Sequence, residues 1–171
     1  MFLLPKVPCS VLGLVVTLFI GPAAFAADPP ALVIFPFTLI DTSLQGEMAG
    51  RSEAETVRLE QITRQATERL AQNDRFRPID PAPVADEMAR LPRISRCNGC
   101  ELRLGRELGA DLVLVGWVQK VSNLILNINM RLSDVRTGKV LAGRSVDIRG
   151  NDDLSWQRGM RQLLREDLPV S

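Results

Sequence analysis

The residues in this sequence best suited to chemistry are Cys97 and Cys100, which lie in the segment Cys-Asn-Gly-Cys. Two thiols at this spacing can form a redox centre, half of a metal site, a haem attachment point or a structural disulfide. A c-type haem requires histidine directly after the second cysteine, and that position is Glu101. Haem attachment is therefore excluded, and three interpretations remain.

The three remaining interpretations differ in what else the chain must supply. A zinc site needs further ligands, and the sequence contains no histidine that could provide them. A redox role fits a cysteine pair at a helix N-terminus, where the helix dipole stabilises a thiolate, but a thioredoxin-like motif should follow an early strand. A disulfide fits an exported chain that keeps an even number of cysteines once Cys9 is removed. We expect a Cys97–Cys100 disulfide, with no metal and no cofactor, and keep thiol-disulfide exchange as the alternative.

The composition excludes several classes of enzyme. The chain has neither histidine nor tyrosine, which rules out Ser-His-Asp and Cys-His nucleophile activation within one chain. It carries 21 basic and 20 acidic residues, so no global charge attracts nucleic acid or anionic lipid. With only 5% aromatic residues, platforms for stacking bases are scarce as well. We therefore expect neither nucleic-acid binding nor acid-base catalysis by histidine.

Residues 1–26 are typical of a secretory signal peptide. Lys6 is followed by an apolar run over 11–20, and small residues at Ala24 and Ala26 suit cleavage after Ala26. The run is too short for a comfortable membrane span, so an uncleaved anchor is the less favoured alternative. We expect a periplasmic protein without stable membrane insertion, whose residues 27–171 form one domain.

The hydrophobic periodicity of residues 27–171 predicts the secondary structure. Strands are predicted at 31–41, 75–80, 110–121, 124–132 and 140–149, and helices at 53–72, 84–90, 101–108 and after Asn151, which we expect to cap the last helix. The segment 42–52 is predicted to be a loop. This order predicts one α/β domain of mixed α+β character, in which a mixed sheet ends in an antiparallel meander followed by a helix.

Three of these elements carry more specific predictions. Pro36 lacks a ladder donor, which suggests a sheet edge or a bulge in the first strand. In the helix at 53–72 the apolar stripe is formed by Leu59, Ile62, Ala66 and Leu70. Along 124–132 the even positions are apolar, whereas Asn127, Asn129 and Arg131 are polar, so this strand should have one buried face and one face in water.

Polar side chains in three segments form the candidate binding surfaces. They are Asp41, Thr42 and Ser43; Lys120, Asn123, Asn127 and Asn129; and Asp147, Arg149 and Trp156. The first group follows a strand, where open α/β sheets tend to bind ligands. Turn and cap formation also explains many of these residue types. Asn127 and Asn129 are the harder pair to explain in that way, because asparagine is depleted in strands.

The segment 108–150 resembles exported α/β domains related to the amino-terminal domain of TolB and to CsgG. The resemblance lies in "GADLVLVGWV", "RLSDVRTGK" and the strand that follows. More narrowly, "IDTSLQGE", "CNGCEL", "QKVSNLILNIN" and "DIRGNDDLSW" are similar to an uncharacterised bacterial family with exported members, some encoded near quinoprotein dehydrogenases. The resemblance implies a fold, a compartment and a partner protein of the cell envelope, and it implies no catalytic residue.

Three functions follow from these observations. The favoured hypothesis is a non-enzymatic exported accessory module that presents a polar sheet face or sheet edge to an envelope protein. The second is a thiol-disulfide oxidoreductase using Cys97 and Cys100. The third is a carrier of a small ligand or metal ion that uses Asp41, Asp147 and the asparagines.

Overall fold

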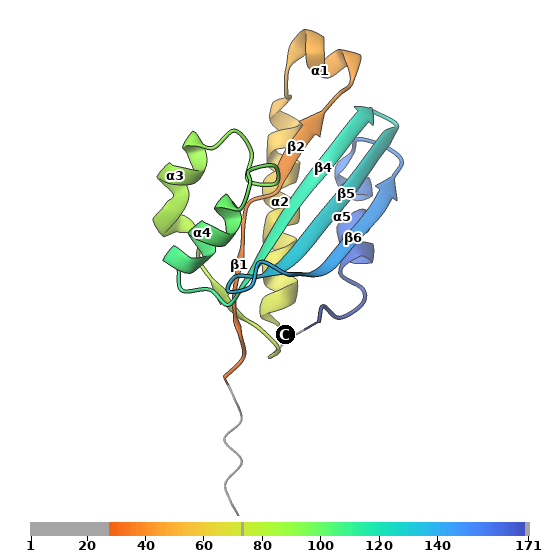
Figure 1. The fold of residues 1–171 in the computed structure, drawn as a ribbon. Coiled ribbons are helices and arrows are strands. Elements are labelled where there is room, and N and C mark those ends of the chain that lie inside the picture. The colour runs from red at the N-terminus through yellow and green to blue at the C-terminus, as the bar shows by residue number, and fades with distance from the viewer. Residues whose placement is uncertain (1–27, 73, 170–171) are drawn as a thin grey trace, which may run out of the picture.

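The computed structural model describes residues 28–72 and 74–169, which form a six-stranded mixed sheet between two layers of helices (Figure 1). The strands are β1 (Ala31–Ile34), β2 (Thr38–Asp41), β3 (Arg77–Ile79), β4 (Leu112–Ser122), β5 (Ile125–Asp134) and β6 (Val140–Ile148). Their order is β3-β1-β4-β5-β6, with β2 also paired to β4. Pairs among β1 to β4 are parallel, whereas β4, β5 and β6 are antiparallel neighbours. The predicted mixed sheet and its antiparallel meander are confirmed, and the signal peptide predicted at 1–26 lies outside the described residues.

The helices cover the two faces of the sheet unequally. They are α1 (Leu44–Ala49), α2 (Glu53–Ala71), α3 (Ala85–Arg90), α4 (Cys100–Glu107) and α5 (Asp153–Leu163), with a 3-10 turn, η1, at Ala82–Val84. The long helices α2 and α5 pack on one face, and α3 and α4 lie on the other (Figure 1). The predicted apolar stripe of α2 is buried in the larger core, as its helical spacing requires: Leu59, Ile62, Ala66 and Leu70.

The first predicted strand, 31–41, is wrong as a single element because the chain breaks around Pro36. β1 and β2 are separate four-residue strands, and both pair in parallel with β4. Proline lacks the N–H that a continuous ladder would use. The next N–H, that of Phe37, is donated to Oγ1 of Thr63 in α2 at 3.0 Å instead of to a strand. The ring of Phe37 packs over Gly116, where no side chain stands in its way.

Two further predictions, of a loop and of a helix cap, are also corrected. The segment predicted as a loop at 42–52 contains α1, because the Ser43 hydroxyl accepts a hydrogen bond from the N–H of Gly46 and caps a short helix. The cap of α5 is Asp152 and not Asn151, since the Asp152 carboxylate accepts the N–H of Ser155 at 2.9 Å. Asn151 is thereby free to bond elsewhere.

The helical layer formed by α3 and α4 covers only part of its face of the sheet. The smaller core beneath it includes Val33 and Phe35 with Val113 and Val115 of β4, and Leu104 of α4. The upper ends of β4, β5 and β6 extend past α3 and α4 (Figure 1). In the described part of the chain, no helix is both long enough and apolar enough to cross a membrane.

Candidate functional site

Lys120 lies at the centre of a buried ionic cluster at the carboxyl end of β4. Its side chain is 2% exposed, and its Nζ lies 3.0 Å from Oδ2 of Asp41 and 2.6 Å from Oε1 of Glu55. The parallel register of β2 and β4 places Asp41 directly beside Lys120. The first turn of α2 supplies Glu55, whose other oxygen accepts the N–H of Ser52 in a capping box. Strand register and helix capping therefore position the two carboxylates around one ammonium group.

The electrostatics of this cluster keep all three groups charged at neutral pH. Burial alone would raise the pKa of Asp41 and Glu55, but hydrogen bonds and the nearby Lys120 ammonium outweigh it, so both pKa values are lowered. Burial alone would lower the pKa of Lys120, but the two carboxylates outweigh it and raise that pKa. A lysine held protonated in this way is neither a nucleophile nor a general base at neutral pH. The cluster is therefore suited to holding β2, β4 and α2 together and not to catalysis by Lys120.

Asn151 extends the cluster to α5 and to the molecular surface. Its Nδ2 donates to Oε1 of Glu55 at 2.8 Å and to Oδ1 of Asn123 at 3.2 Å, and its Oδ1 accepts the Nε1–H of Trp156 at 3.0 Å. Asn123 in turn donates to Oε1 of Gln45 in α1 at 2.6 Å. A cleft of about 410 Å³ opens above these groups. Trp156 is fully buried, and its hydrogen bond to Asn151 connects it to this surface.

Three of the predicted residues, Asn127, Asn129 and Asp147, lie on the uncovered part of the sheet. Gln119 and Ser145, which were not predicted, lie beside them, and we call these five residues the open sheet face. The β5–β6 register pairs Asn127 with Asp147 and Asn129 with Ser145. Asn127 donates to Oδ1 of Asp147 at 2.6 Å and accepts from Oγ of Ser145 at 2.9 Å. The predicted alternation is confirmed within β5, because Leu126, Ile128, Met130 and Leu132 are buried under the helices on the opposite face. Leu124, which was assigned to the same face, precedes β5 and is exposed.

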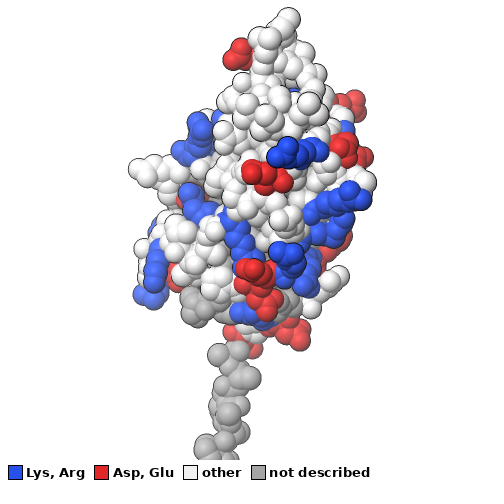
Figure 2. Space-filling model, turned by 90° about the vertical axis from the view of Figure 1, so that its right-hand side faces the viewer, with Lys and Arg blue, Asp and Glu red and all other residues white. Residues whose placement is uncertain are grey.

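The end of the molecule next to the open sheet face is apolar. We call it the apical surface and define it by four exposed residues, Leu44 and Met48 of α1 with Leu124 and Ile125 at the β4–β5 turn. Each of these side chains is more than 60% exposed. In Figure 2, the upper end of the molecule carries few charged residues, whereas basic and acidic side chains are mixed over the lower part. Exposed apolar groups gathered in this way are typical of interaction sites.

The structure thus divides the predicted binding residues into two groups on opposite faces of the sheet. Asp41, Lys120, Asn123 and Trp156 belong to the buried cluster and its extension. Thr42 and Ser43 lie beside that cluster; the Thr42 hydroxyl donates to the carbonyl of Lys120 at 3.1 Å, and Ser43 donates to Oδ1 of Asp41 at 2.6 Å. Asn127, Asn129 and Asp147 lie on the open sheet face. Arg149 is exposed just beyond the end of β6.

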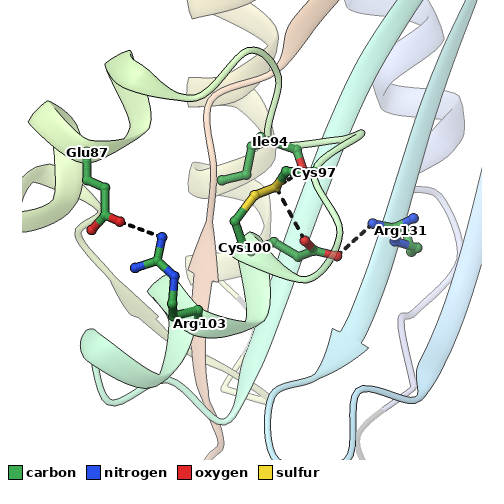
Figure 3. The surroundings of a disulfide bond; sticks show 7 residues. Glu87, Ile94, Cys97, Cys100, Arg103 and Arg131 are labelled. Carbon is green, nitrogen blue, oxygen red and sulfur yellow. Dashed lines mark hydrogen bonds and ion pairs between the residues drawn. A yellow bond between two sulfur atoms is a disulfide. The ribbon is translucent and has the colours of Figure 1, made fainter.

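Cys97 and Cys100 form the predicted disulfide at the start of α4 (Figure 3). Gly99 between them has a φ of 83°, a conformation that glycine adopts readily. The Sγ of Cys97 lies 3.7 Å from Oε2 of Glu101, and Oε1 of Glu101 accepts from Nη2 of Arg131 at 2.9 Å. Glu101 is 6% exposed, so its negative charge opposes formation of a thiolate beside it. This environment favours a structural disulfide over a reactive one.

Sequence reasoning missed the roles of Glu55, Glu101 and Arg131. Glu55 follows Ser52 by three residues, and this capping-box spacing is a signal that could have identified its place in the first turn of α2. No local pattern indicates that it would also meet Lys120, which is 65 residues away. Arg131 was recognised only as a polar residue of β5, and its pairing with Glu101 depends on how α4 packs against the sheet.

Residues 30–168 match the model of the DUF3280 family, which is described as a protein of unknown function (DUF2380). The chain belongs to this family. Membership of a family of unknown function was predicted from the sequence and is confirmed. No curated protein matches the chain by sequence.

Solved structures share the fold at low sequence identity. The LpoB C-terminal domain from Salmonella enterica matches with a TM-score of 0.50 and 18% identity, over 74% of this chain and 87% of that domain. Lipoprotein GNA1162 from Neisseria meningitidis gives a TM-score of 0.47 and 20% identity, over 72% of this chain and 83% of that one. TolB from Acinetobacter baumannii gives 0.40 and 11%, over 77% of this chain and 25% of its own. The LpoB domain shows that this DUF3280 chain has a fold found in other bacterial proteins.

Proposed function

We propose that this DUF3280 protein is a non-enzymatic, exported accessory module that binds a protein partner in the cell envelope. The observation that carries the proposal is the open sheet face, a part of the sheet that α3 and α4 leave uncovered. Its asparagine, serine and aspartate side chains are ordered by hydrogen bonds across two strands. A polar surface held in this way is presented to a partner with little loss of side-chain entropy.

The apical surface extends this binding region with apolar contacts. Ile125 lies in β5 two residues before Asn127, so apolar and polar groups follow one another along the same strand. Protein interfaces combine an apolar centre with polar groups that fix the orientation of the partner. The Lys120 cluster contributes indirectly, because Asn123 links the β4–β5 turn to α1 through Gln45. The proposal therefore assigns the cluster a positioning role beneath the surface.

The signal peptide expected at 1–26 assigns the chain to the periplasm in this proposal. The sequence resemblance further suggests that the partner belongs to a quinoprotein dehydrogenase system, and we include that in the proposal. Thiol-disulfide exchange is less favoured because Glu101 opposes a thiolate at Cys97. A carrier that uses Asp41, Asp147 and the asparagines is also less favoured, because the two carboxylates lie in separate clusters and both have hydrogen-bond partners.

Site-specific photo-cross-linking in living cells tests the proposal. A photoreactive residue is placed in the full chain at Gln119 or Ser145 on the open sheet face, or at Glu60 on the exposed side of α2 as the matched control. We expect the two sheet positions to give the same adduct with one envelope protein, and Glu60 to give none. Mass spectrometry of the adduct then identifies the partner and so tests whether it is part of a quinoprotein dehydrogenase system.

A binding role on this face also predicts that the adduct depends on its polar side chains. Asn127→Leu combined with Asp147→Leu should abolish the adduct formed from Gln119 while leaving the circular dichroism of the purified protein unchanged. Equal adducts from Glu60 and Ser145, or an adduct that survives the double substitution, would contradict binding through the open sheet face. Absence of any adduct from both sheet positions would contradict the accessory function itself.

A further inference from the structure

The disulfide and its neighbours contain a set of metal-ligating groups that the sequence alone did not complete. Within residues 28–72 and 74–169, Cys97, Cys100 and Glu101 form a group in which one ligand atom from each lies within 4.8 Å of the others. The spacing of the cysteines supplies two ligands, and the first turn of α4 turns the Glu101 carboxylate toward the sulfur of Cys97. Three potential ligand atoms therefore lie close together while the two sulfurs are joined as a disulfide.

Arg131 holds the third of these ligands in place from outside the group. Its guanidinium binds Oε1 of Glu101 at 2.9 Å, and Oε2 of Glu101 lies 3.7 Å from Sγ of Cys97. Hydrogen bonds of this kind orient metal ligands and are important for affinity. Two thiolates and one carboxylate carry three negative charges, and a divalent cation together with the Arg131 guanidinium balances them. The charges of the reduced group and its surroundings thus match a divalent ion.

We propose that the dithiol form of this protein binds one Zn²⁺ through the sulfurs of Cys97 and Cys100 and Oε2 of Glu101. Zinc accepts thiolate and carboxylate ligands together in a tetrahedral arrangement, and water takes the fourth position. Calcium and magnesium take oxygen ligands, and Cu(I) favours sulfur without carboxylate. The disulfide and the zinc site exclude each other, because both use the same two sulfur atoms. The start of α4 therefore carries either the Cys97–Cys100 disulfide or a bound zinc ion, but not both.

Conversion of the disulfide to the dithiol form requires a two-electron reductant. A trialkylphosphine cleaves the S–S bond, takes an oxygen from water to become a phosphine oxide, and leaves two thiols. Binding of Zn²⁺ to these thiols then releases two protons. The site is independent of the proposed partner binding, and its test needs only the purified protein.

The experiment titrates Co²⁺, as a spectroscopic substitute for Zn²⁺, into the full chain carrying Cys9→Ser after reduction with a trialkylphosphine. We expect a one-to-one complex with a thiolate-to-cobalt charge-transfer band and the intense visible bands of a tetrahedral site, both removed when Zn²⁺ displaces cobalt. The oxidised protein should show neither band. Zn²⁺ should also raise the melting temperature of the reduced protein and leave that of the oxidised protein unchanged.

Substitutions separate the folded three-ligand site from a flexible pair of thiols. Glu101→Gln should retain the charge-transfer band while lowering zinc affinity at least about tenfold, and Arg131→Met should lower it about tenfold, in the range known for residues that orient metal ligands. Glu107→Gln, an exposed carboxylate at the end of the same helix, is the matched control and should bind as the parent protein does.

Several results would overturn the proposal. They are the absence of a charge-transfer band in the reduced protein, unchanged affinity in Glu101→Gln and Arg131→Met, and equal binding by the oxidised protein. Near-ultraviolet circular dichroism records the fold of each reduced sample. A reduced chain that is unfolded and does not regain its spectrum with Zn²⁺ would also overturn it, because the proposed site includes the contact with Arg131.

Discussion

The ammonium group of Lys120 lies 2.6 Å from the carboxylate of Glu55, although the two residues are 65 positions apart in the sequence. This contact joins the end of β4 to the first turn of α2. Asp41 adds the end of β2, and Asn151 adds the segment before α5. The cluster around one buried lysine thus links four parts of the chain beneath the proposed binding region.

Replacing Lys120 with methionine should strongly destabilise the protein. The substitution leaves Asp41 and Glu55 without their cation, and breaking a buried pair of this kind costs about 3–5 kcal/mol. Urea denaturation measures the free energy of unfolding. Lys139→Met provides the control, because Lys139 is exposed, and its effect should stay within about 0.5 kcal/mol. Similar losses in the two variants would show that the cluster does not stabilise the fold.

The stability of the parent protein should fall on both sides of neutral pH. Asp41 and Glu55 have lowered pKa values, so their stabilising contribution is complete above their ordinary values of 3.8 and 4.5 and is lost as the pH falls through the folded values. Lys120 has a raised pKa, so its contribution is complete below 10.5 and is lost at more alkaline pH.

In Lys120→Met the acid limb of this dependence should become shallower. Without the cation the pKa of each carboxylate rises toward its ordinary value, although the hydrogen bonds from Ser43 and Ser52 remain, so the variant should lose less stability than the parent as the pH falls below 5. Urea denaturation at several pH values measures both curves. Parallel curves for the two proteins below pH 5 would contradict the coupling of these carboxylates to Lys120.

Gly116→Ala should destabilise the protein through the ring of Phe37. A Cβ at position 116 would overlap this ring, which is itself buried, and overpacking of a core costs about 1–3 kcal/mol. Gly143→Ala on β6 is the matched control, because a Cβ there meets no atom within 4 Å and should change the stability by less than about 0.5 kcal/mol. The melting temperatures of the two variants, measured by thermal unfolding, test this prediction. Equal values would contradict this account of the β1–β2 break.

The disulfide should behave as a structural bond. Closing a ring of four residues contributes about 2 kcal/mol, so Cys97→Ala with Cys100→Ala should lower the free energy of unfolding by about that amount. Equilibration with a series of thiol buffers of known potential should give a reduction potential below about −300 mV, the range of structural disulfides. A potential near −120 mV, typical of a strong dithiol oxidant, would instead support the oxidoreductase hypothesis.

Regular patterns explain why much of the fold was predictable. The stripe of α2 and the alternation of β5 are periodic over many residues, and burial of one face suffices to specify each element. The break at Pro36 was only partly foreseen, as an edge or bulge, because the apolar run continues through it. Helix α1 was missed because its six residues bury no side chain and depend on a cap at Ser43.

The candidate site was less predictable because its partners are far apart in the sequence. Asp41 and Lys120 were both recognised as polar residues of interest, but their pairing depends on the β2–β4 register. Asn151 was predicted to cap α5, and a neighbouring aspartate takes that position instead. Both residue types are good caps, so local preference could not separate them.

By itself, the sequence determined the class of the fold, the absence of histidine chemistry, the disulfide and the side of β5 that faces water, because each depends on composition or on local periodicity. Only the tertiary structure decided that Lys120 is buried between Asp41 and Glu55, that α3 and α4 leave part of the sheet uncovered, and that Arg131 holds Glu101 beside Cys97. Those relationships arise from strand register and helix packing, which bring together side chains that no local pattern connects.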